Sequence, residues 1–512
     1  YKPKIRKPGT GCVTMINNHL YEGRYTPTNA YGKRESHNIY AKTREECEEK
    51  LAEMIKQKNA RKKALNIYFV SLGCDKNLVD SEMMITGLRK AGHCIIDNEQ
   101  EADIIVVNTC CFIGDAKEES INTLINMGEF KTYGKCKLLV ACGCLAQRYH
   151  KEIREQIPEV DVIIGTMSYE ALNEAIDECL LHEGETKECL ESIDYLPKPL
   201  HDRDSMSGGY FAYLKIAEGC DKCCTYCIIP KVRGKYRSVA MEDILAQARH
   251  LVDNGAKELI LVAQETTLYG KDLYGEKSLP LLLEKLSEID ELKWIRILYC
   301  YPEEITDELI DAIKRLPKVC HYLDIPIQHG SDHILKRMGR YTDQAEIKRI
   351  VSKLHEEIPD IALRTTLITG FPGETQQDFD ILKEFVKEMK FERLGVFTYS
   401  REEDTKAAEF EQQVPQEIKE VRKNEIMEIQ QQIAFAYCKE QIGRVMEVMI
   451  EGRLPEEGVY IARTYMDAPD IDGYVFVESE WNLISGDFIT VEIIGADEYD
   501  LIGKVVEDDS EV

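Results

Sequence analysis

Long apolar runs are missing from this sequence of 512 residues. No stretch of about 18 apolar residues occurs, which excludes an ordinary transmembrane helix. The N-terminus, Tyr1-Lys2-Pro3-Lys4, is basic, but no apolar run follows it, so a secretory signal is not predicted. Basic residues are also scarce, because 65 Lys and Arg stand against 92 Asp and Glu, and the net charge is −27. We therefore expect an acidic, cytoplasmic protein without membrane contact.

Cysteine is not scarce, since the chain has 18. In a small secreted domain such a number would indicate disulfides. Here the chain is long, no secretory signal is predicted, and several cysteines have metal-ligand spacings, so reduced thiols and metal chemistry are the better interpretation. Many of them can also serve as small buried apolar residues. We expect about six functional cysteines, the remainder being structural.

The first 64 residues differ in charge from the rest of the chain. They hold 15 Lys and Arg against 7 Asp and Glu, whereas residues 441–512 hold 4 against 18. Strands are predicted near 13–15, 20–25 and 36–40, followed by a helix that Thr43 can cap. This module, especially Glu22-Gly23-Arg24-Tyr25, resembles the AP2-like arm-type DNA-binding domain of phage integrases. It is expected either to contact nucleic acid or to be a solvated basic appendage.

The remaining sequence predicts three further domains. Residues 65–183 alternate strands and helices, which indicates a flavodoxin-like, doubly wound parallel sheet. Residues 184–208 are polar and predict a linker. Residues 209–437 contain six strand candidates separated mostly by helices, typical of a partial (β/α) barrel. Residues 440–508 change to period-two patterns, which predict a small β-barrel. The fold class is therefore multidomain α/β, with a small α+β module at 1–64.

A CxxxCxxC pattern formed by Cys220, Cys224 and Cys227 is the strongest local signal. It follows the first strand of the predicted barrel, at the end where active sites are built. Three thiolates on one loop can hold three irons of a 4Fe–4S cluster and leave the fourth iron open. A zinc knuckle is the alternative, but it would normally need a fourth protein ligand. Cys223, between two of these residues, makes the register ambiguous.

A second set of cysteines lies in the first α/β domain. Cys74, Cys110 and Cys144 each end a predicted strand, and they are separated by about one strand–helix unit. Carboxyl ends of parallel strands share one edge of a sheet, so three thiolates can meet there and again leave one iron open. Small residues in tight turns would be the structural alternative. Cys111 and Cys142 are neighbours of this set, so spacing alone does not decide which cysteines are ligands.

The CxxxCxxC loop, with Tyr226 just before its third cysteine, resembles the radical S-adenosylmethionine (SAM) superfamily. The resemblance implies that SAM chelates the open iron and that the cluster cleaves it to a deoxyadenosyl radical. It also places Tyr226 near the adenine. The segment 367–374 looks like the SAM-contacting glycine segment of the family, and this implies cofactor contacts for Gly370, Gly373 and Glu374.

Three N-terminal motifs are similar to the cysteine motifs of the methylthiotransferase family: Ser71 to Glu82, Asn108 to Ile113, and Gly143 to Tyr149. The resemblance runs from about residue 66 to residue 506 and covers the methylthiotransferase, radical SAM and TRAM domains. It implies a second 4Fe–4S cluster held by Cys74, Cys110 and Cys144. The additional cysteines Cys111, Cys142 and Cys223, and the basic residues 1–64, are departures from the family pattern.

Within this family, segments 72–77, 263–267 and 463–473 look most like the branch that modifies an aspartate of ribosomal protein S-twelve. The resemblance implies that one SAM supplies the methyl of a methylthio group, while a second SAM yields the radical that removes hydrogen from the aspartate β-carbon. Expected partners are this basic protein or the small ribosomal subunit, and an electron donor. The acidic residues 441–512 would repel tRNA, the substrate of related enzymes. A tRNA methylthiotransferase and an iron–sulfur nucleic-acid sensor remain the alternatives.

Overall fold

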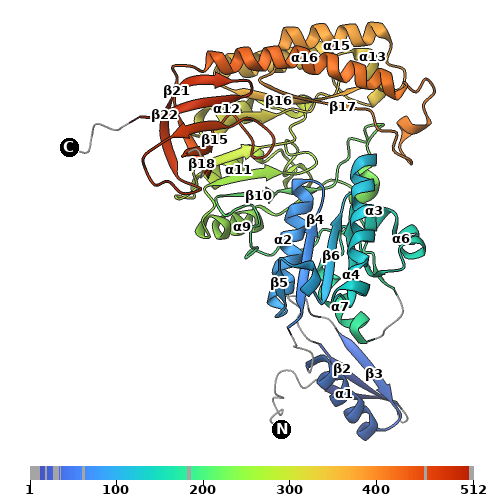
Figure 1. Ribbon diagram of the computed structural model, residues 1–512. Helices are drawn as coiled ribbons and strands as arrows, with labels where there is room; N and C mark the ends of the chain where they lie inside the picture. The colour runs from blue at the N-terminus through green and yellow to red at the C-terminus, as the bar shows by residue number, and fades with distance from the viewer. Residues whose placement is uncertain are drawn as a thin grey trace.

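The computed structural model describes residues 12–17, 20–26, 34, 36–59, 64–181, 186–454 and 458–506. Within these residues, four larger sheets follow one another along the chain. Figure 1 shows the small N-terminal sheet at one end, the first α/β sheet next to it, and the larger α/β sheet beyond, with the C-terminal barrel at its side. No described helix is long and apolar enough to cross a membrane.

The N-terminal module contains the three strands and the helix that its sequence predicts. Strands β1 (Cys12–Asn17), β2 (Leu20–Tyr25) and β3 (His37–Ala41) form an antiparallel sheet, which is followed by α1 (Arg44–Asn59). The Thr43 hydroxyl caps α1 by accepting a hydrogen bond from the Glu46 amide at 3.2 Å. Cys47 and Leu51 are buried and approach Gly23 of the sheet, so one face of α1 packs on β2.

The first α/β unit is a six-stranded, fully parallel sheet in the order β5-β4-β6-β7-β8-β9. This arrangement confirms the flavodoxin-like expectation. Its strands are β4 (Asn66–Ser71), β5 (Cys94–Ile96), β6 (Ile104–Thr109), β7 (Leu138–Gly143), β8 (Val160–Ile164) and β9 (Lys187–Cys189). Its helices are α2 (Asp75–Lys90), α3 (Gly114–Gly128), α4 (Phe130–Tyr133), α5 (Cys144–Arg148), α6 (His150–Gln156) and α7 (Leu172–Leu181).

Two features of this unit differ from the sequence expectation. The stretch expected as a linker contributes β9, which pairs with β8 at the sheet edge. A strand of three residues carries too short a pattern to be recognised from sequence. The sequence also predicts a helix from about Asp80 to Ala91, but α2 begins at Asp75, directly after Cys74. The thiol of Cys74 therefore stands at the N-terminus of a helix.

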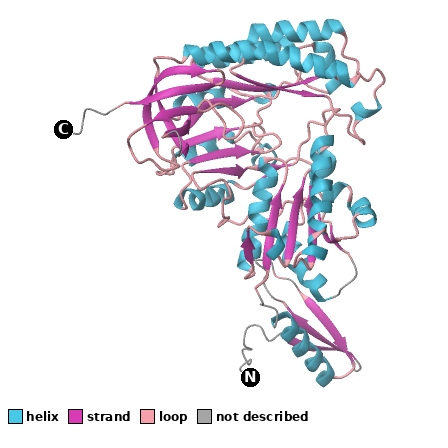
Figure 2. Cartoon of the chain, in the orientation of Figure 1, coloured by secondary structure: helices cyan, strands magenta, loops and turns pink. Residues whose placement is uncertain are grey.

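The second α/β unit is also a six-stranded parallel sheet, and it stays open, as expected for a partial barrel. Its strands are β10 (Phe211–Lys215), β13 (Glu258–Val262), β14 (Trp294–Ile297), β15 (Val319–Asp324), β16 (Ala362–Thr369) and β17 (Arg393–Thr398). The short strands β11 (Ala217–Glu218) and β12 (Arg237–Ser238) pair beside it. The helices are α8 (Ile229–Arg233), α9 (Met241–Asp253), α10 (Lys271–Tyr274), α11 (Leu279–Ser287), α12 (Asp307–Arg315), α13 (Asp332–Met338), α14 (Gln344–Glu357), α15 (Gln376–Met389) and α16 (Gln416–Glu440). Figure 2 shows how these helices border the strands.

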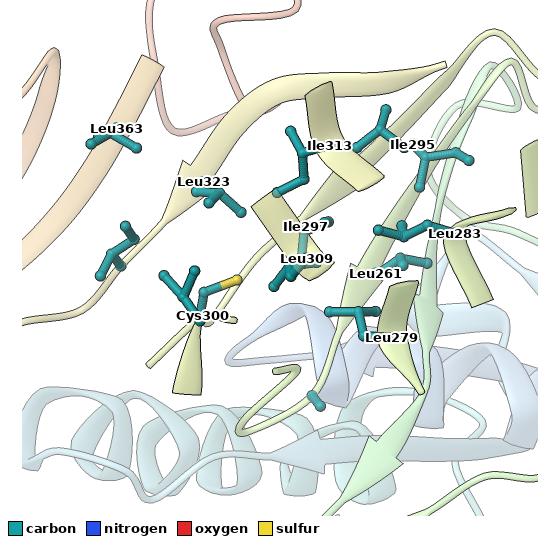
Figure 3. Packing of buried hydrophobic residues seen from close by; sticks show 14 of the residues in the cluster. Leu261, Leu279, Leu283, Ile295, Ile297, Cys300, Leu309, Ile313, Leu323 and Leu363 are labelled. Atoms are coloured by element: carbon teal, nitrogen blue, oxygen red, sulfur yellow. The ribbon is translucent and has the colours of Figure 1, made fainter. Parts of the chain in front are cut away.

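Alternate residues of this sheet serve two different cores. Leu261, Ile295 and Ile297 point toward the flanking helices and pack with Leu283 and Leu309 (Figure 3). Their neighbours along the strands, such as Ile260 and Trp294, belong to a second cluster that includes residues of the C-terminal barrel. The period-two alternation of the strands therefore separates a helix-covered face from a face that the C-terminal barrel helps to close.

The C-terminal unit is a closed barrel in the order β18-β19-β20-β22-β21. Its strands are β18 (Val445–Leu454), β19 (Val459–Arg463), β20 (Val475–Glu478), β21 (Phe488–Asp497) and β22 (Asp500–Val505). Arg463 is fully buried and donates to Glu258 at 2.5 Å, and Arg296 donates to the same carboxylate at 2.7 Å. Segment 463–473 thus helps to attach the barrel to the neighbouring sheet.

Candidate functional site

The CxxxCxxC loop begins two residues after β11. Cys220 and Cys224 are buried, Cys227 is half-buried, and Cys223 between them is exposed. The Cys220 amide donates to Gly234 at 3.1 Å, and the Cys227 amide donates to Cys224 at 3.0 Å, so the loop closes on itself. Burial raises the pKa of Cys220 to about 12. Without a metal this thiol is protonated, and a bound metal has to displace the proton.

Aromatic and cationic side chains surround this loop. The Tyr226 ring packs edge-on against Phe371, with 6.3 Å between centroids. The Tyr301 hydroxyl lies 3.8 Å from the Cys224 Sγ, and the Arg340 guanidinium lies 4.1 Å above the Tyr301 ring. Arg340 is buried, and its Nε and Nη1 have no hydrogen-bond partner among the described residues. This is an anion-binding arrangement that the sequence did not indicate.

The glycine segment after β16, residues 370–374, is fixed by contacts with other side chains of the same unit. Gly370 has a φ of +71°, and a Cβ there would overlap the Lys419 side chain. A Cβ at Gly373 would lie 2.8 Å from the Arg337 Nε. The Glu374 carboxylate accepts the Gly370 amide at 2.7 Å and Arg422 at 2.8 Å. These contacts explain the residue types by local packing, and they assign Glu374 a role in fixing the segment.

The other three cysteines lie at the carboxyl ends of β4, β6 and β7, which are neighbours in the first sheet. Cys74 is exposed, while Cys110 and Cys144 are buried. A Cβ added at Gly73 would lie 2.9 Å from the Cys110 Sγ, so the turns before α2 and after β6 are in close contact. The topology therefore brings the predicted trio to one sheet edge.

Asn77 ties these turns together. Its amide nitrogen donates to the carbonyls of Leu72 and Thr109, at 2.9 and 3.0 Å. Its amide oxygen lies 3.7 Å from the Cys144 Sγ. One buried side chain thus contacts the segments that carry all three cysteines.

Of the two competing cysteines, Cys142 faces away from the trio. It lies within β7, where its thiol donates to the Val107 carbonyl at 3.4 Å. Cys111 is buried in an apolar cluster that also contains Cys144, so it stays close to the trio. The described residues contain no group of three or more His, Cys, Asp or Glu side chains arranged for a single metal ion. A 4Fe–4S cluster makes a different demand, since each thiolate binds its own iron.

A buried ionic network lies between the two sets of cysteines. Arg233, at the end of α8, donates to Asp80 and Glu218 at 3.0 Å each, and to the Asn77 oxygen at 2.5 Å. Lys215 donates to the same two carboxylates. Burial alone would raise the pKa of Glu218, but Arg233 and Lys215 lower it overall. All four charged groups are nearly inaccessible to solvent.

Three family matches cover most of the chain. Residues 66–165 match an uncharacterised protein family, UPF0004, residues 214–386 match the radical SAM superfamily, and residues 442–506 match the TRAM domain. The chain is 60% identical over 439 residues to the ribosomal protein uS12 methylthiotransferase RimO of Lachnoclostridium phytofermentans, an alignment that covers 86% of this chain and 99% of that protein. The chain belongs to the RimO family of radical SAM methylthiotransferases.

A second curated relative agrees with this assignment. RimO of Clostridioides difficile is 49% identical over 442 residues, covering 86% of this chain and 99% of that protein. Among solved structures, the radical SAM methyltransferase TsrM from Kitasatospora setae shares 12% identity and a TM-score of 0.48, covering 65% of this chain and 73% of that chain.

Membership in the RimO family confirms several expectations from the sequence. It confirms a SAM-dependent transferase of sulfur-containing groups, with SAM and two 4Fe–4S clusters as cofactors. It favours this enzyme over the tRNA-modifying enzyme and the nucleic-acid sensor. The domain boundaries and the identity of the cluster ligands stay predictions.

Proposed function

We propose that this chain adds a methylthio group to the β-carbon of an aspartate in ribosomal protein uS12, the S-twelve protein of the small subunit. The observation that supports this most is the placement of the two cysteine trios on either side of one buried ionic network. One trio lies at the carboxyl ends of parallel strands, and the other lies on the loop after β11. This arrangement suits a reaction that needs two clusters near one another.

The donor sets fit the two clusters. Cys220, Cys224 and Cys227 would hold one, and three ligands leave its fourth iron open for SAM. The other would be held at the edge of the first sheet by Cys74, Cys110 and Cys144. When bound, these cofactors supply the radical and the methylthio group.

The protein's own residues orient the cofactor. Tyr226, packed on Phe371, would lie along the adenine of SAM. The free N–H groups of Arg340 would bind its carboxylate, a geometry in which guanidinium groups are effective. Gly370, Gly373 and Glu374 would form the wall of the SAM site, with Glu374 fixing the backbone of this segment.

The acidic charge of the chain supports a basic protein substrate. Residues 441–512 hold 18 acidic against 4 basic residues, so the C-terminal barrel would attract uS12 and repel free tRNA. The TRAM match suggests RNA contact as well, which a substrate within the small ribosomal subunit would also provide. A ribosomal substrate supports a cytoplasmic enzyme, which an electron donor of that compartment would serve.

A substrate competition tests the proposal. Anaerobically reconstituted protein receives SAM, reductant, sulfide, a uS12 peptide and unmodified tRNA, and mass spectrometry follows the methylthio group. We expect it on the peptide aspartate alone. Cys110→Ala should abolish transfer, whereas the matched variant Cys111→Ala should retain it. Modification of tRNA alone would refute the substrate assignment.

Residues 1–64 need a separate test, because the first family match begins at residue 66. Their basic charge is consistent with a nucleic-acid contact. A protein of residues 65–512 should then keep peptide modification but bind ribosomal subunits more weakly. Unchanged binding would favour the solvated appendage.

A further inference from the structure

Arg233 connects the two halves of the site described above. It lies six residues after Cys227, at the last position of α8, yet its guanidinium reaches Asp80 and Asn77 of the first sheet's unit. Its side chain is 2% exposed. Since little solvent screens these contacts, the Coulomb attraction in them is stronger than in a surface ion pair.

The partner Asn77 extends this connection to the cysteines. The Asn77 oxygen that accepts from Arg233 also lies 3.7 Å from the Cys144 Sγ. The Asn77 amide nitrogen donates a hydrogen bond to the carbonyl of Thr109, the residue before Cys110. Arg233 therefore fixes the orientation of Asn77, a side chain that contacts all three cysteine-bearing segments.

On its other side, Arg233 is bound to the radical SAM loop. Glu218 accepts from Arg233 at 3.0 Å and precedes Cys220 by two residues. Gln264 donates to the second oxygen of Glu218 at 2.9 Å. A displacement of either cysteine-bearing loop would thus break contacts of the same guanidinium.

The charges of the network balance without a cofactor. Lys215 and Arg233 are opposed by Asp80 and Glu218, and all four are buried. Lys215 is directed to the carboxylates alone, while Arg233 also reaches toward the cysteines through Asn77. Arg233 is therefore the cation of this network that lies toward the thiolates, and its charge interacts with Cys144 and Cys74. Lys76 is a second buried cation near Cys74, and it is paired with Asp75 at 2.9 Å.

We propose that Arg233 is a positioning residue that holds the two cluster sites in register and sets a fixed positive charge beside the cluster at Cys74, Cys110 and Cys144. The inference rests on the ligand sets proposed above. A nearby cation favours the reduced, more negative state of a cluster. A neutral residue in place of Arg233 should therefore lower the reduction potential of this cluster. A lysine there keeps the positive charge and should keep the reduction potential closer to that of the parent protein.

The experiment measures the reduction potential of this cluster. The full chain carrying Cys224→Ala, which retains the cluster at Cys74, Cys110 and Cys144, is reconstituted and titrated with dithionite under electron paramagnetic resonance. Adding Arg233→Gln should reduce the equilibrium constant for one-electron reduction at least tenfold, a shift of about 59 mV to lower potential. Arg233→Lys should recover at least half of that shift. Lys231→Gln removes a charge from the same helix and should leave the potential unchanged.

A variant that should shift the reduction potential in the opposite direction separates a charge effect from misfolding. Glu218→Gln removes a counter-charge but keeps a hydrogen-bond acceptor for Arg233, so it should raise the potential. Equal potentials in the parent, Arg233→Gln and Glu218→Gln proteins overturn the inference while leaving the proposed function intact. If the parent protein loads no cluster, the ligand assignment and this inference fall together.

Discussion

Arg340 gives the most direct test of how the site binds SAM. Its Nε and Nη1 are buried and have no hydrogen-bond partners among the described residues. The guanidinium carbon lies 4.1 Å from the centroid of the Tyr301 ring. A hydrogen bond to a charged group contributes about 1.5–3 kcal/mol. Two such bonds to the SAM carboxylate would contribute at least about 3 kcal/mol, so Arg340→Met should weaken SAM binding about 100-fold.

The assay is equilibrium binding of SAM to the anaerobically reconstituted protein. Lys336→Met is the matched control, because Lys336 is an exposed cation of α13, the helix that ends two residues before Arg340. This variant should bind SAM as the parent does. Iron content has to be equal in all three proteins, which separates lost SAM contacts from lost cluster. A change of less than threefold for Arg340→Met would refute the assignment of this carboxylate site.

Three further predictions concern the stability of the site and the fold. Gly73→Ala should lower the iron content of the reconstituted protein, because the new Cβ would lie 2.7 Å from the Cys110 Cβ. Gly92→Ala is the control, since Gly92 has a similar positive φ but open space around it. Equal iron loss in both variants would refute the steric argument. Glu258→Gln should destabilise the protein by about 3–5 kcal/mol, since it leaves Arg296 and Arg463 buried beside a neutral group, and thermal unfolding with limited proteolysis of the C-terminal barrel would show this. Burial raises the pKa of Glu392 from 4.5 to about 7, so the unfolded state loses its proton first and stability falls as pH rises through this window. Glu392→Gln should therefore flatten the pH dependence of the unfolding temperature between these values, and a parallel decline in both proteins would contradict it.

The sequence predicted those parts of the molecule that depend on regular patterns. Buried runs at 67–72, 104–108, 138–141 and 162–164 predict four strands of the first sheet, and the structure has β4, β6, β7 and β8 there. Runs near 211–217, 258–263, 294–299, 321–327, 362–369 and 394–399 predict the six strands of the open barrel, and these are also present. The patterns predict β18, β20 and β21 of the C-terminal barrel but not β19 and β22, and they do not predict β5 and β9 of the first sheet. Short or weakly alternating segments become strands because neighbouring strands offer unpaired backbone groups, which is a tertiary effect.

The meeting of cysteines at one edge of the first sheet could be foreseen from topology, whereas the choice of Cys110 and Cys144 over Cys111 and Cys142 came from the family resemblance. Cys74, Cys110 and Cys144 each follow a strand, and parallel neighbours end at one edge. Nothing in the pattern required Asn77 to reach two other turns, because an amide in the first turn of a helix has many possible partners.

The ionic network between the sites shows the limit of reasoning from sequence. Arg233 and Asn77 are separated by 156 positions, and each stands in a motif that its own cysteines already explain. From local sequence alone, an arginine at the end of a short helix is expected to face solvent and to interact with the helix dipole. Only the packing of two sheets against one another removes the water and leaves Asp80, Asn77 and Glu218 as its partners. Because burying an unpaired charge is strongly unfavourable, this contact can form only when both cysteine-bearing units are docked. The buried guanidinium therefore couples the docking of the two units to the geometry of both cysteine sets. The coupling arises because its partners Asn77 and Glu218 stand next to the cysteine-bearing loops of the two units.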